Sequence, residues 1–278
     1  MGINTTEREK LVLKYFMTTP KKPNYSGSYF WFIVGAGLIL FTLGNPAIQR
    51  QSAGMLCIII GVIVLLLTFF KFTSKKARYK KAYNLAEPKA TDEQMDRWLE
   101  EGRVMIYKAA MERLDIDEED SKGKDQLIID GPAKQFTIKP GKDKILRFVK
   151  HDTLLFFLTD HNVSTFKCTY DLALGEILED RTKEFPYKDI TNLETETATD
   201  TFYYQNDVKT KIEGIKSFSL FTSGGNKISI NYFFIKNTGE DHEGYRFPPS
   251  NDENTIKAIR KKLIEYKDKK MKKTEEGS

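Results

Sequence analysis

The sequence predicts an α+β membrane protein built from a transmembrane helix hairpin, a helical connector and an antiparallel β domain. Three observations predict it. Two long runs near the N-terminus contain no charged residue, apolar and polar residues alternate from Leu127 onward, and one amphipathic helix pattern lies near the C-terminus. Strands at short spacing without helices between them favour an antiparallel barrel or sandwich, closed here by the last helix.

The charge of the chain is concentrated at its N-terminal end. The 278 residues carry a net charge of +5, yet residues 1–90 hold 13 Lys and Arg against three acidic residues. The remaining chain is therefore net acidic, which argues against nucleic-acid binding. Cys57 lies within an apolar run, so a disulfide to Cys168 is not expected, and neither cysteine has metal-ligand spacing. Both fit a reducing, cytoplasmic setting.

The two apolar runs are Tyr29–Gly44 and Ala53–Phe70. An α-helix needs about 20 apolar residues to cross a hydrocarbon layer roughly 30 Å thick. The second run reaches that length with the two residues after it, and the first reaches it with a few flanking residues. We therefore predict a transmembrane hairpin over residues 29–72, rather than a buried helix pair or a cleaved signal peptide.

Basic residues outside the two runs predict the orientation. Lysines precede the first run and a cluster follows the second, whereas the connecting loop contains only Arg50. By the positive-inside rule, both termini face the cytoplasm. The cluster should also attract anionic lipid headgroups, each cation contributing about 1 kcal/mol. This basic cluster comprises Lys71, Lys75, Lys76, Arg78, Lys80 and Lys81.

Small residues indicate how the helices pack. Ala53, Cys57 and Gly61 recur every four residues, a pattern that allows close approach of a neighbouring helix. The expected partner is the first helix, through Gly37 and Gly44, or another subunit. The spans contain no ionisable residue, which disfavours an ion or proton pathway through this pair alone.

The hairpin is flanked by two predicted helical segments. Residues 1–28 form a cytoplasmic segment in which Thr6 and Glu9 make a capping-box pattern for a short amphipathic helix at the membrane interface. Residues 73–122 form a basic juxtamembrane segment and a helical connector. We expect its helix over about 92–114, capped by Thr91 with Gln94 and broken or kinked at Gly102. Its apolar face should pack on the domain that follows.

Residues 123–270 are predicted to form the β domain, followed by a disordered tail at 271–278. The acidic run before this domain fails the calcium-loop pattern, because Asp120 and Gln126 occupy the positions that require Gly and Glu. We interpret that run as a solvated turn. At the other end of the domain, one helix face carries the apolar residues Ile256, Ile259, Leu263 and Tyr266.

Four stretches of this domain carry a family resemblance. They are LFFLTDHNVSTF (155–166), FPYKDITNLET (185–195), FSLFTSGGNKISI (218–230) and NTIKAIRKKL (254–263). In this order they resemble bacterial pleckstrin-homology-like (PH-like) domains, over about residues 145–270. The resemblance implies a curved antiparallel sheet closed by one helix, and membrane-anchored members are familiar in bacteria. The polar stretch 195–215 departs from the pattern and leaves the middle strand pairings open.

The double glycine of TSGGNKIS suggests a phosphate-binding loop, but no helix pattern follows it. We interpret it as a hairpin corner. A three-residue loop over 223–225 aligns Leu220 with Ile228 and Phe218 with Ile230, and such a loop needs positive φ at its third residue, Gly225.

No motif in the sequence supplies a nucleophile with a base, a metal site or a cofactor site, so we predict a non-enzymatic protein without cofactor or metal. The resemblance implies one candidate anion site, because eukaryotic relatives hold inositol phosphates near the first loop. Its residues are Lys139, Lys142, Lys144 and Arg147. The alternative for these residues is a solvated loop that faces an anionic membrane.

We expect a scaffold or interaction module in the bacterial inner membrane that assembles with itself, a protein partner or lipid. The alternative is an effector whose soluble domain senses a ligand, in which case the helices oligomerise or perturb the membrane.

Overall fold

The computed structural model describes residues 5–49, 52–116, 127–133, 137–203, 209–233 and 252–276. The chain divides into two compact units. One comprises Met17–Pro88, and the other joins Met1–Phe16 to Lys89–Ser278. We refer to them as the helical unit and the β unit.

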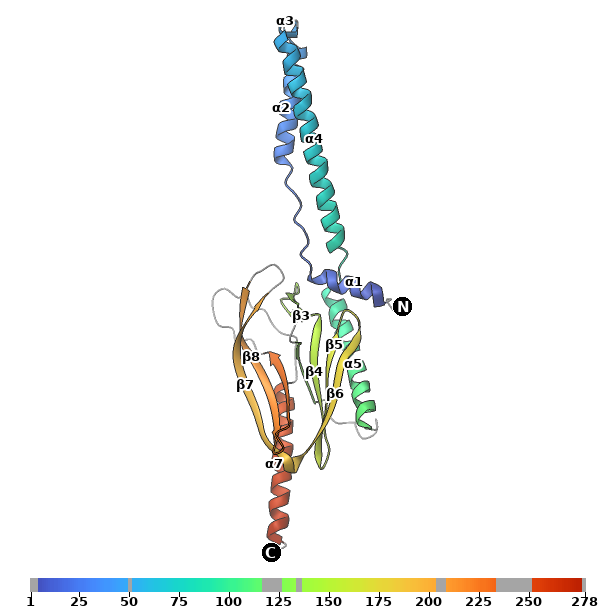
Figure 1. Cartoon of the computed structure of the whole chain (residues 1–278), viewed down its shortest axis with the longest axis vertical. Coiled ribbons are helices and arrows are strands. Elements are labelled where there is room, and N and C mark those ends of the chain that lie inside the picture. Colours follow the sequence, from blue (N-terminus) through green and yellow to red (C-terminus); the bar gives the residue numbers. More distant parts are fainter. Residues whose placement is uncertain are drawn as a thin grey trace. The chain divides into compact units, whose positions relative to one another are not determined.

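The helical unit is an α-helical hairpin (Figure 1). Helix α2 spans Ser26–Leu43, the short α3 spans Pro46–Gln49, and α4 spans Ser52–Ala86. Both long helices are long and apolar enough to cross a membrane. With 35 residues, α4 is about 52 Å long, so it continues well past the apolar run and carries the basic cluster on its last turns.

The β unit contains two antiparallel sheets and a small hairpin. The four-stranded sheet has the order β1-β4-β5-β6, the three-stranded sheet has the order β7-β8-β9, and β2 pairs with β3. The strands are β1 Leu127–Pro132, β2 Ile138–Pro140, β3 Leu146–Phe148, β4 Lys150–Leu158, β5 Asn162–Asp171, β6 Glu176–Pro186, β7 Ile190–Tyr203, β8 Lys209–Thr222 and β9 Lys227–Phe233.

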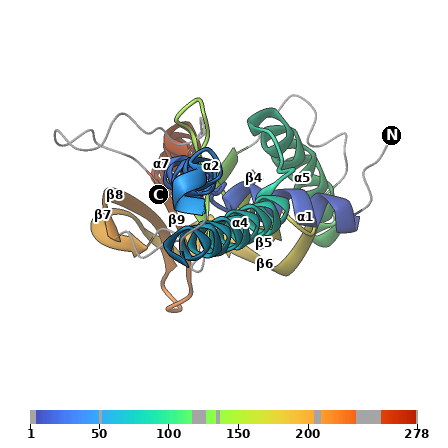
Figure 2. The same cartoon turned by 90° about the horizontal axis from the view of Figure 1, so that it is seen from above.

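Three helices complete the β unit. They are α1 Thr5–Phe16, α5 Asp92–Leu114 and α7 Asp252–Glu276, with a short 3-10 helix, η1 Tyr187–Asp189, between β6 and β7. Figure 2 shows the layers: β7–β9 with α7 lie on one side of the four-stranded sheet, and α5 with α1 lies on the other. The four-stranded sheet is therefore covered on both faces.

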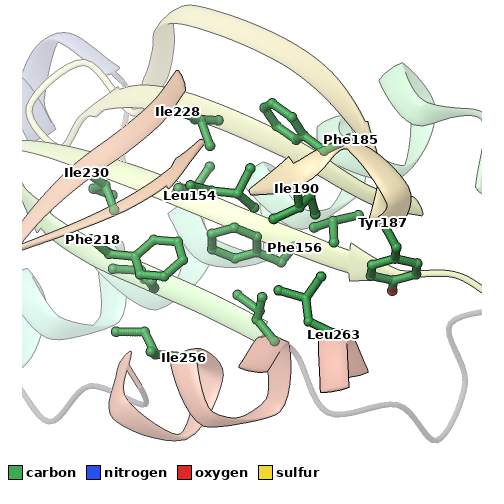
Figure 3. Close-up of a cluster of buried hydrophobic side chains, with 14 of the residues drawn as sticks. Leu154, Phe156, Phe185, Tyr187, Ile190, Phe218, Ile228, Ile230, Ile256 and Leu263 are labelled. Carbon is green, nitrogen blue, oxygen red and sulfur yellow. The ribbon is translucent and has the colours of Figure 1, made fainter. Parts of the chain in front are cut away.

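The first core lies between the two sheets and α7 (Figure 3). Phe156 of β4 and Phe218 of β8 meet edge to face, with ring centroids 5.7 Å apart. The predicted apolar face of the last helix is confirmed, because its four residues, Ile256, Ile259, Leu263 and Tyr266, all belong to this core or pack against it.

The second core lies on the opposite face of the four-stranded sheet. Consecutive residues of β4 divide between the two cores: Leu154 and Phe156 face the first, and Leu155 faces the second. On this side, Met95 and Trp98 of α5 pack in the core with residues of β4 and β5. The prediction that the connector helix packs on the following domain is confirmed.

Of the two predicted alternatives, a barrel or a sandwich, the barrel is wrong, because the described sheets do not close. Strand β6 pairs with β5 and β7 pairs with β8, and the chain passes from one sheet to the other through η1 without pairing β6 to β7 among the described residues. Two separate sheets sharing one core replace the closed cylinder.

The hairpin corner at the double glycine is confirmed. Phe218 lies opposite Ile230 and Leu220 lies opposite Ile228, so both pairs face the first core. Gly225 has φ +77°, the left-handed conformation that glycine adopts at no steric cost.

The sequence predicts a break or a kink at Gly102; the break is wrong, since α5 is continuous. Its capping box is present: the Gln94 amide donates to Thr91 Oγ1 at 3.2 Å, and the Thr91 amide donates to Gln94 Oε1 at 2.9 Å. Gly102 is buried instead against Tyr170 of β5, and a Cβ added there would lie 2.5 Å from the tyrosine ring. The glycine therefore permits close helix–sheet packing.

Two further expectations at the chain ends are corrected. Helix α1 is present, but Val12, Tyr15 and Phe16 are buried in the second core, so its apolar face packs against protein instead of a membrane interface. Arg8 fixes it to β5 by donating from Nη2 to Tyr170 Oη at 2.9 Å. At the other end, α7 continues to Glu276, beyond the predicted boundary at residue 270.

Candidate functional site at the basic hairpin

The predicted anion-binding residues lie on the hairpin formed by β2 and β3. Lys139 lies directly opposite Arg147 in the strand pairing, and Lys142 and Lys144 lie in the turn between the strands. The turn is closed by a hydrogen bond from the Gly141 amide to the Ile145 carbonyl at 2.8 Å. We call this element the basic hairpin.

Arg147 is buried and fully engaged by carboxylates, with only 4% of its side chain exposed. Its Nε and Nη2 donate to the two oxygens of Asp96 at 2.8 and 2.7 Å. Its Nη1 and Nη2 donate to the two oxygens of Asp143 at 2.9 and 2.8 Å. Two bidentate pairs are the strongest geometry available to a guanidinium. The hydrogen bonds from Arg147 lower the pKa of Asp143 to about 2.

A third carboxylate, Asp92, joins this cluster to α1. Asp92 Oδ1 lies 3.7 Å from Arg147 Nη1 and accepts a hydrogen bond from the Tyr15 hydroxyl at 2.7 Å. Burial, together with this hydrogen bond, raises the pKa of Tyr15 above its usual range, so the phenol stays protonated and donates. Asp92 Oδ2 accepts from the Lys142 amide at 2.8 Å. The first residue of α5 therefore contacts both α1 and the basic hairpin.

Lys139 completes the contact with α1. Its Nζ donates to the Tyr15 carbonyl at 2.6 Å and lies 5.3 Å from the centre of the Tyr15 ring. This carbonyl belongs to the last turn of α1, where backbone acceptors lack helical partners and a cation is favourable.

The geometry defines what the basic hairpin can do chemically. Two of its predicted anion ligands, Lys139 and Arg147, have internal partners, and an anion at Arg147 must displace Asp96 or Asp143. The arrangement is a polar clamp that joins three elements. Space is tight as well, because a Cβ at Gly141 would lie 2.1 Å from Arg147 Nη1.

The acidic and phenolic members of the clamp were not identified from the sequence. Tyr15, Asp92, Asp96 and Asp143 come from three segments that are far apart in the chain, and each has an ordinary role in its own segment. Asp92, for example, has the charge expected in the first turn of a helix. The only sequence signal for this site was the run of basic residues alternating with Gly and Asp over 139–147, and that run predicted an anion-binding site instead of a clamp.

The basic cluster of α4 extends from the end of the apolar run. Its six cationic side chains are all exposed, and no acidic residue lies between Lys71 and Lys81. The cluster covers about 15 Å of helix length.

The α2–α4 contact uses one residue of the predicted small-residue stripe. Gly61 is buried, and a Cβ added there would lie 2.7 Å from Ile39 Cγ1 and 3.0 Å from the Gly35 carbonyl. Ala53 is exposed and Cys57 is half-buried. The close approach therefore occurs at the Gly35–Gly61 crossing.

The predicted partners Gly37 and Gly44 do not take part in this contact. A Cβ at Gly37 meets nothing within 4 Å, and one at Gly44 meets only its own helix. The buried positions follow a seven-residue spacing instead of the predicted four, as expected for two helices that cross at a small angle. They are Ser28, Gly35 and Thr42 in α2, and Gly54, Gly61 and Thr68 in α4.

Potential catalytic groups of the β unit lie in its interior. His151 is buried and packs edge to face on Phe148 at 5.5 Å, and burial lowers its pKa to about 4. Burial raises the pKa of the Cys168 thiol to about 12. His161 lies in an exposed turn, and His242 lies outside the described residues. In the part of the chain that the structure describes, no group of His, Cys, Asp or Glu has a metal-binding arrangement.

No protein-family model matches the chain, and no curated protein or solved structure shows significant similarity to it.

Proposed function

We propose that this chain is a membrane-anchored, non-enzymatic interaction module whose α2–α4 hairpin spans the bilayer and whose β unit is a PH-like domain at the cytoplasmic face of a bacterial inner membrane. The observation that carries the proposal is the apolar surface of the hairpin. Ile33, Leu40 and Met55 are 71%, 69% and 70% exposed. Exposing such side chains to water costs about 25 cal/mol for each Å², whereas exposing them to lipid does not.

The length of the hairpin supports a spanning arrangement. Helix α2 has 18 residues and is therefore about 27 Å long, close to the hydrocarbon thickness. At its N-terminal end, the Tyr25 and Tyr29 rings lie 4.9 and 6.3 Å from the Phe72 ring of α4. Aromatic clusters of this kind are typical of the membrane–water interface.

The position of the basic cluster supports the orientation and a lipid partner. Lys71 is adjacent to the aromatic cluster, so Lys71, Lys75 and Lys76 fall within reach of the headgroup layer. Arg50 is the only Lys or Arg in the sequence of the loop between the long helices. Anionic lipids are therefore the first partner that we propose.

The PH-like assignment rests on the four sequence stretches and on the order of the elements. The resemblance implies antiparallel strands followed by one closing helix, and in the β unit two antiparallel sheets precede α7. The non-enzymatic role is proposed because His151 and Cys168 are buried out of reach of a substrate, and the Cys168 thiol stays protonated at neutral pH.

Membrane extraction and co-purification test this function. The full chain should remain in the membrane pellet after alkaline carbonate washing and should be released by detergent. Cross-linking before solubilisation should then recover a partner protein, a second copy or anionic lipid with the β unit. Release into the carbonate supernatant would contradict membrane anchoring.

One observation favours the alternative of a ligand-sensing effector. The basic hairpin contacts the last turn of α1 and the first residue of α5, the two elements of the β unit that the chain joins to the helical unit. Such a contact is suited to passing a signal along the chain. Overexpression should then depolarise cells, and Gly61→Leu should abolish this effect by separating α2 from α4. If overexpression of the wild-type protein does not depolarise cells, the effector function is excluded.

A further inference from the structure

We propose that the basic hairpin is a latch that couples the two chain segments connecting the β unit to the helical unit. We call these the first connector (residues 17–25, after α1) and the second connector (residues 87–91, before α5). The inference deepens the proposed function, because these connectors lead to the membrane helices. Its test reads the ends of α1 and α5 that adjoin the connectors, so it can fail while membrane anchoring holds.

Hydrogen bonds join the chain on either side of the first connector's start to the chain around the second connector. Within the β unit, the Ala90 amide donates to the Leu11 carbonyl at 3.1 Å, and Tyr15 donates to Asp92 at 2.7 Å. Within the helical unit, Thr19 Oγ1 donates to Glu87 Oε1 at 2.7 Å. The end of α1 is therefore bonded to the start of α5, and the first connector is bonded to the second through Thr19 and Glu87.

The basic hairpin adds the third element and locks this pair. Lys139 binds the Tyr15 carbonyl at the end of α1, and the Lys142 amide binds Asp92 at the start of α5. Arg147 lies between these two contacts and holds Asp96 one turn further along α5. One buried guanidinium thus fixes the position of the hairpin relative to both helices.

Arg147 is the residue on which the latch depends. Its charge compensates Asp92, Asp96 and Asp143, which all lie within 3.7 Å of its nitrogens. Without the guanidinium, the bridge between Asp143 of the hairpin and Asp96 of α5 is lost, and three like charges repel one another, two of them on side chains that are already 39% and 56% exposed. The hairpin then separates from α5, and the ends of α1 and α5 that lead into the two connectors lose their shared support.

The latch couples the two connectors, so that the ordered and loosened states of one depend on those of the other. Coupling between two sites is reciprocal, so a change that loosens the first connector must loosen the second, and the reverse. In the anchored protein, a displacement of α2 would reach α5, and a ligand on the β unit would act on both membrane helices together.

Hydrogen–deuterium exchange on the full chain in detergent micelles tests the proposal. The variants are Arg147→Met, which removes the latch charge, and Tyr15→Phe, which removes one hydroxyl on the α1 side. The matched control is Arg113→Met, because Arg113 also pairs with the sheet from α5, through Asp180 at 3.1 Å, but lies at the other end of that helix. The same samples are scored for carbonate extraction.

We expect both latch variants to speed exchange about tenfold in peptides covering 9–16 and 88–95, while peptides of β4 and β5 keep their wild-type rates. Arg113→Met should leave all of these peptides unchanged. Faster exchange confined to 9–16 in Tyr15→Phe would overturn the coupling. Equal acceleration of β4 and β5 in Arg147→Met would also overturn it, since Arg147 would then stabilise the whole unit. If Arg147→Met does not fold, Tyr15→Phe alone decides the question.

Discussion

Single residues of the β unit have roles that depend on their burial. His151 is a neutral imidazole in the interior, since burial lowers its pKa to about 4. An unfolded histidine takes up a proton near pH 6.5. Between these two values the unfolded state binds more protons than the folded state, so the free energy of unfolding decreases as the pH falls.

We therefore expect the unfolding free energy to drop by on the order of 3 kcal/mol between pH 6.5 and pH 4, with most of this slope lost in His151→Leu. Denaturant titrations at several pH values measure it. His161→Gln is the matched control, because His161 is exposed and its replacement should keep the slope. Asp143, with a folded pKa of about 2, adds to the loss of stability only near and below pH 4, where the unfolded carboxyl takes up a proton, and this contribution is the same in His151→Leu and His161→Gln. An unchanged slope in His151→Leu would contradict the assignment.

Gly102 illustrates what the sequence could not reveal at this scale. Glycine lowers helix propensity, so the sequence predicted a break there. The Tyr170 ring fills the space that a side chain at position 102 would occupy, and Tyr170 lies on a strand far along the chain. Only the packed structure brings the two together.

Gly102→Ala should destabilise the protein by about 1–3 kcal/mol, because its Cβ overlaps the Tyr170 ring and that cost exceeds the gain in helix propensity. The midpoint of chemical unfolding measures this change. Gly224→Ala serves as the control, since a Cβ there meets nothing closer than 3.9 Å. A more stable Gly102→Ala protein would show that propensity alone acts at this position.

At the scale of elements, local sequence patterns predicted where helices and strands form, but they did not predict which elements pack against one another. The amphipathic pattern of α1 was recognised, but not that its apolar face packs in the protein core. Likewise, Ala53, Cys57 and Gly61 pointed correctly to helix packing, yet only Gly61 lies at the crossing. A periodic pattern defines a face of a helix, and it does not say which surface covers that face.

The crossing of α2 and α4 can be tested with a matched pair of glycines. Gly61→Leu should separate the helices, since even its Cβ would lie 2.7 Å from Ile39, whereas Gly37→Leu should be tolerated. Thermal unfolding in detergent should show a clearly lower midpoint for Gly61→Leu alone. Equal midpoints for the two variants would place the helix contact elsewhere.

At the scale of the whole molecule, composition carried much of the prediction. Charge-free runs long enough for a bilayer and strand alternation followed by one helix pattern are local features, and the described elements match them. The barrel, one of the two predicted architectures, was wrong, because closure depends on whether the sheet edges pair, β6 with β7 and β1 with β9, which no local pattern determines. The clamp was missed for a related reason, since its members meet only after α1, α5 and the basic hairpin have packed.

The central claim is that the hairpin spans the membrane and holds the β unit in the cytoplasm. Paired reporters test it most directly: one that is active only in the cytoplasm and one that is active only in the periplasm, each fused after Ser278 and, separately, inserted in the loop beside Arg50. We predict cytoplasmic activity after Ser278 and periplasmic activity in the loop. Periplasmic activity after Ser278, or cytoplasmic activity at both positions, would contradict the account.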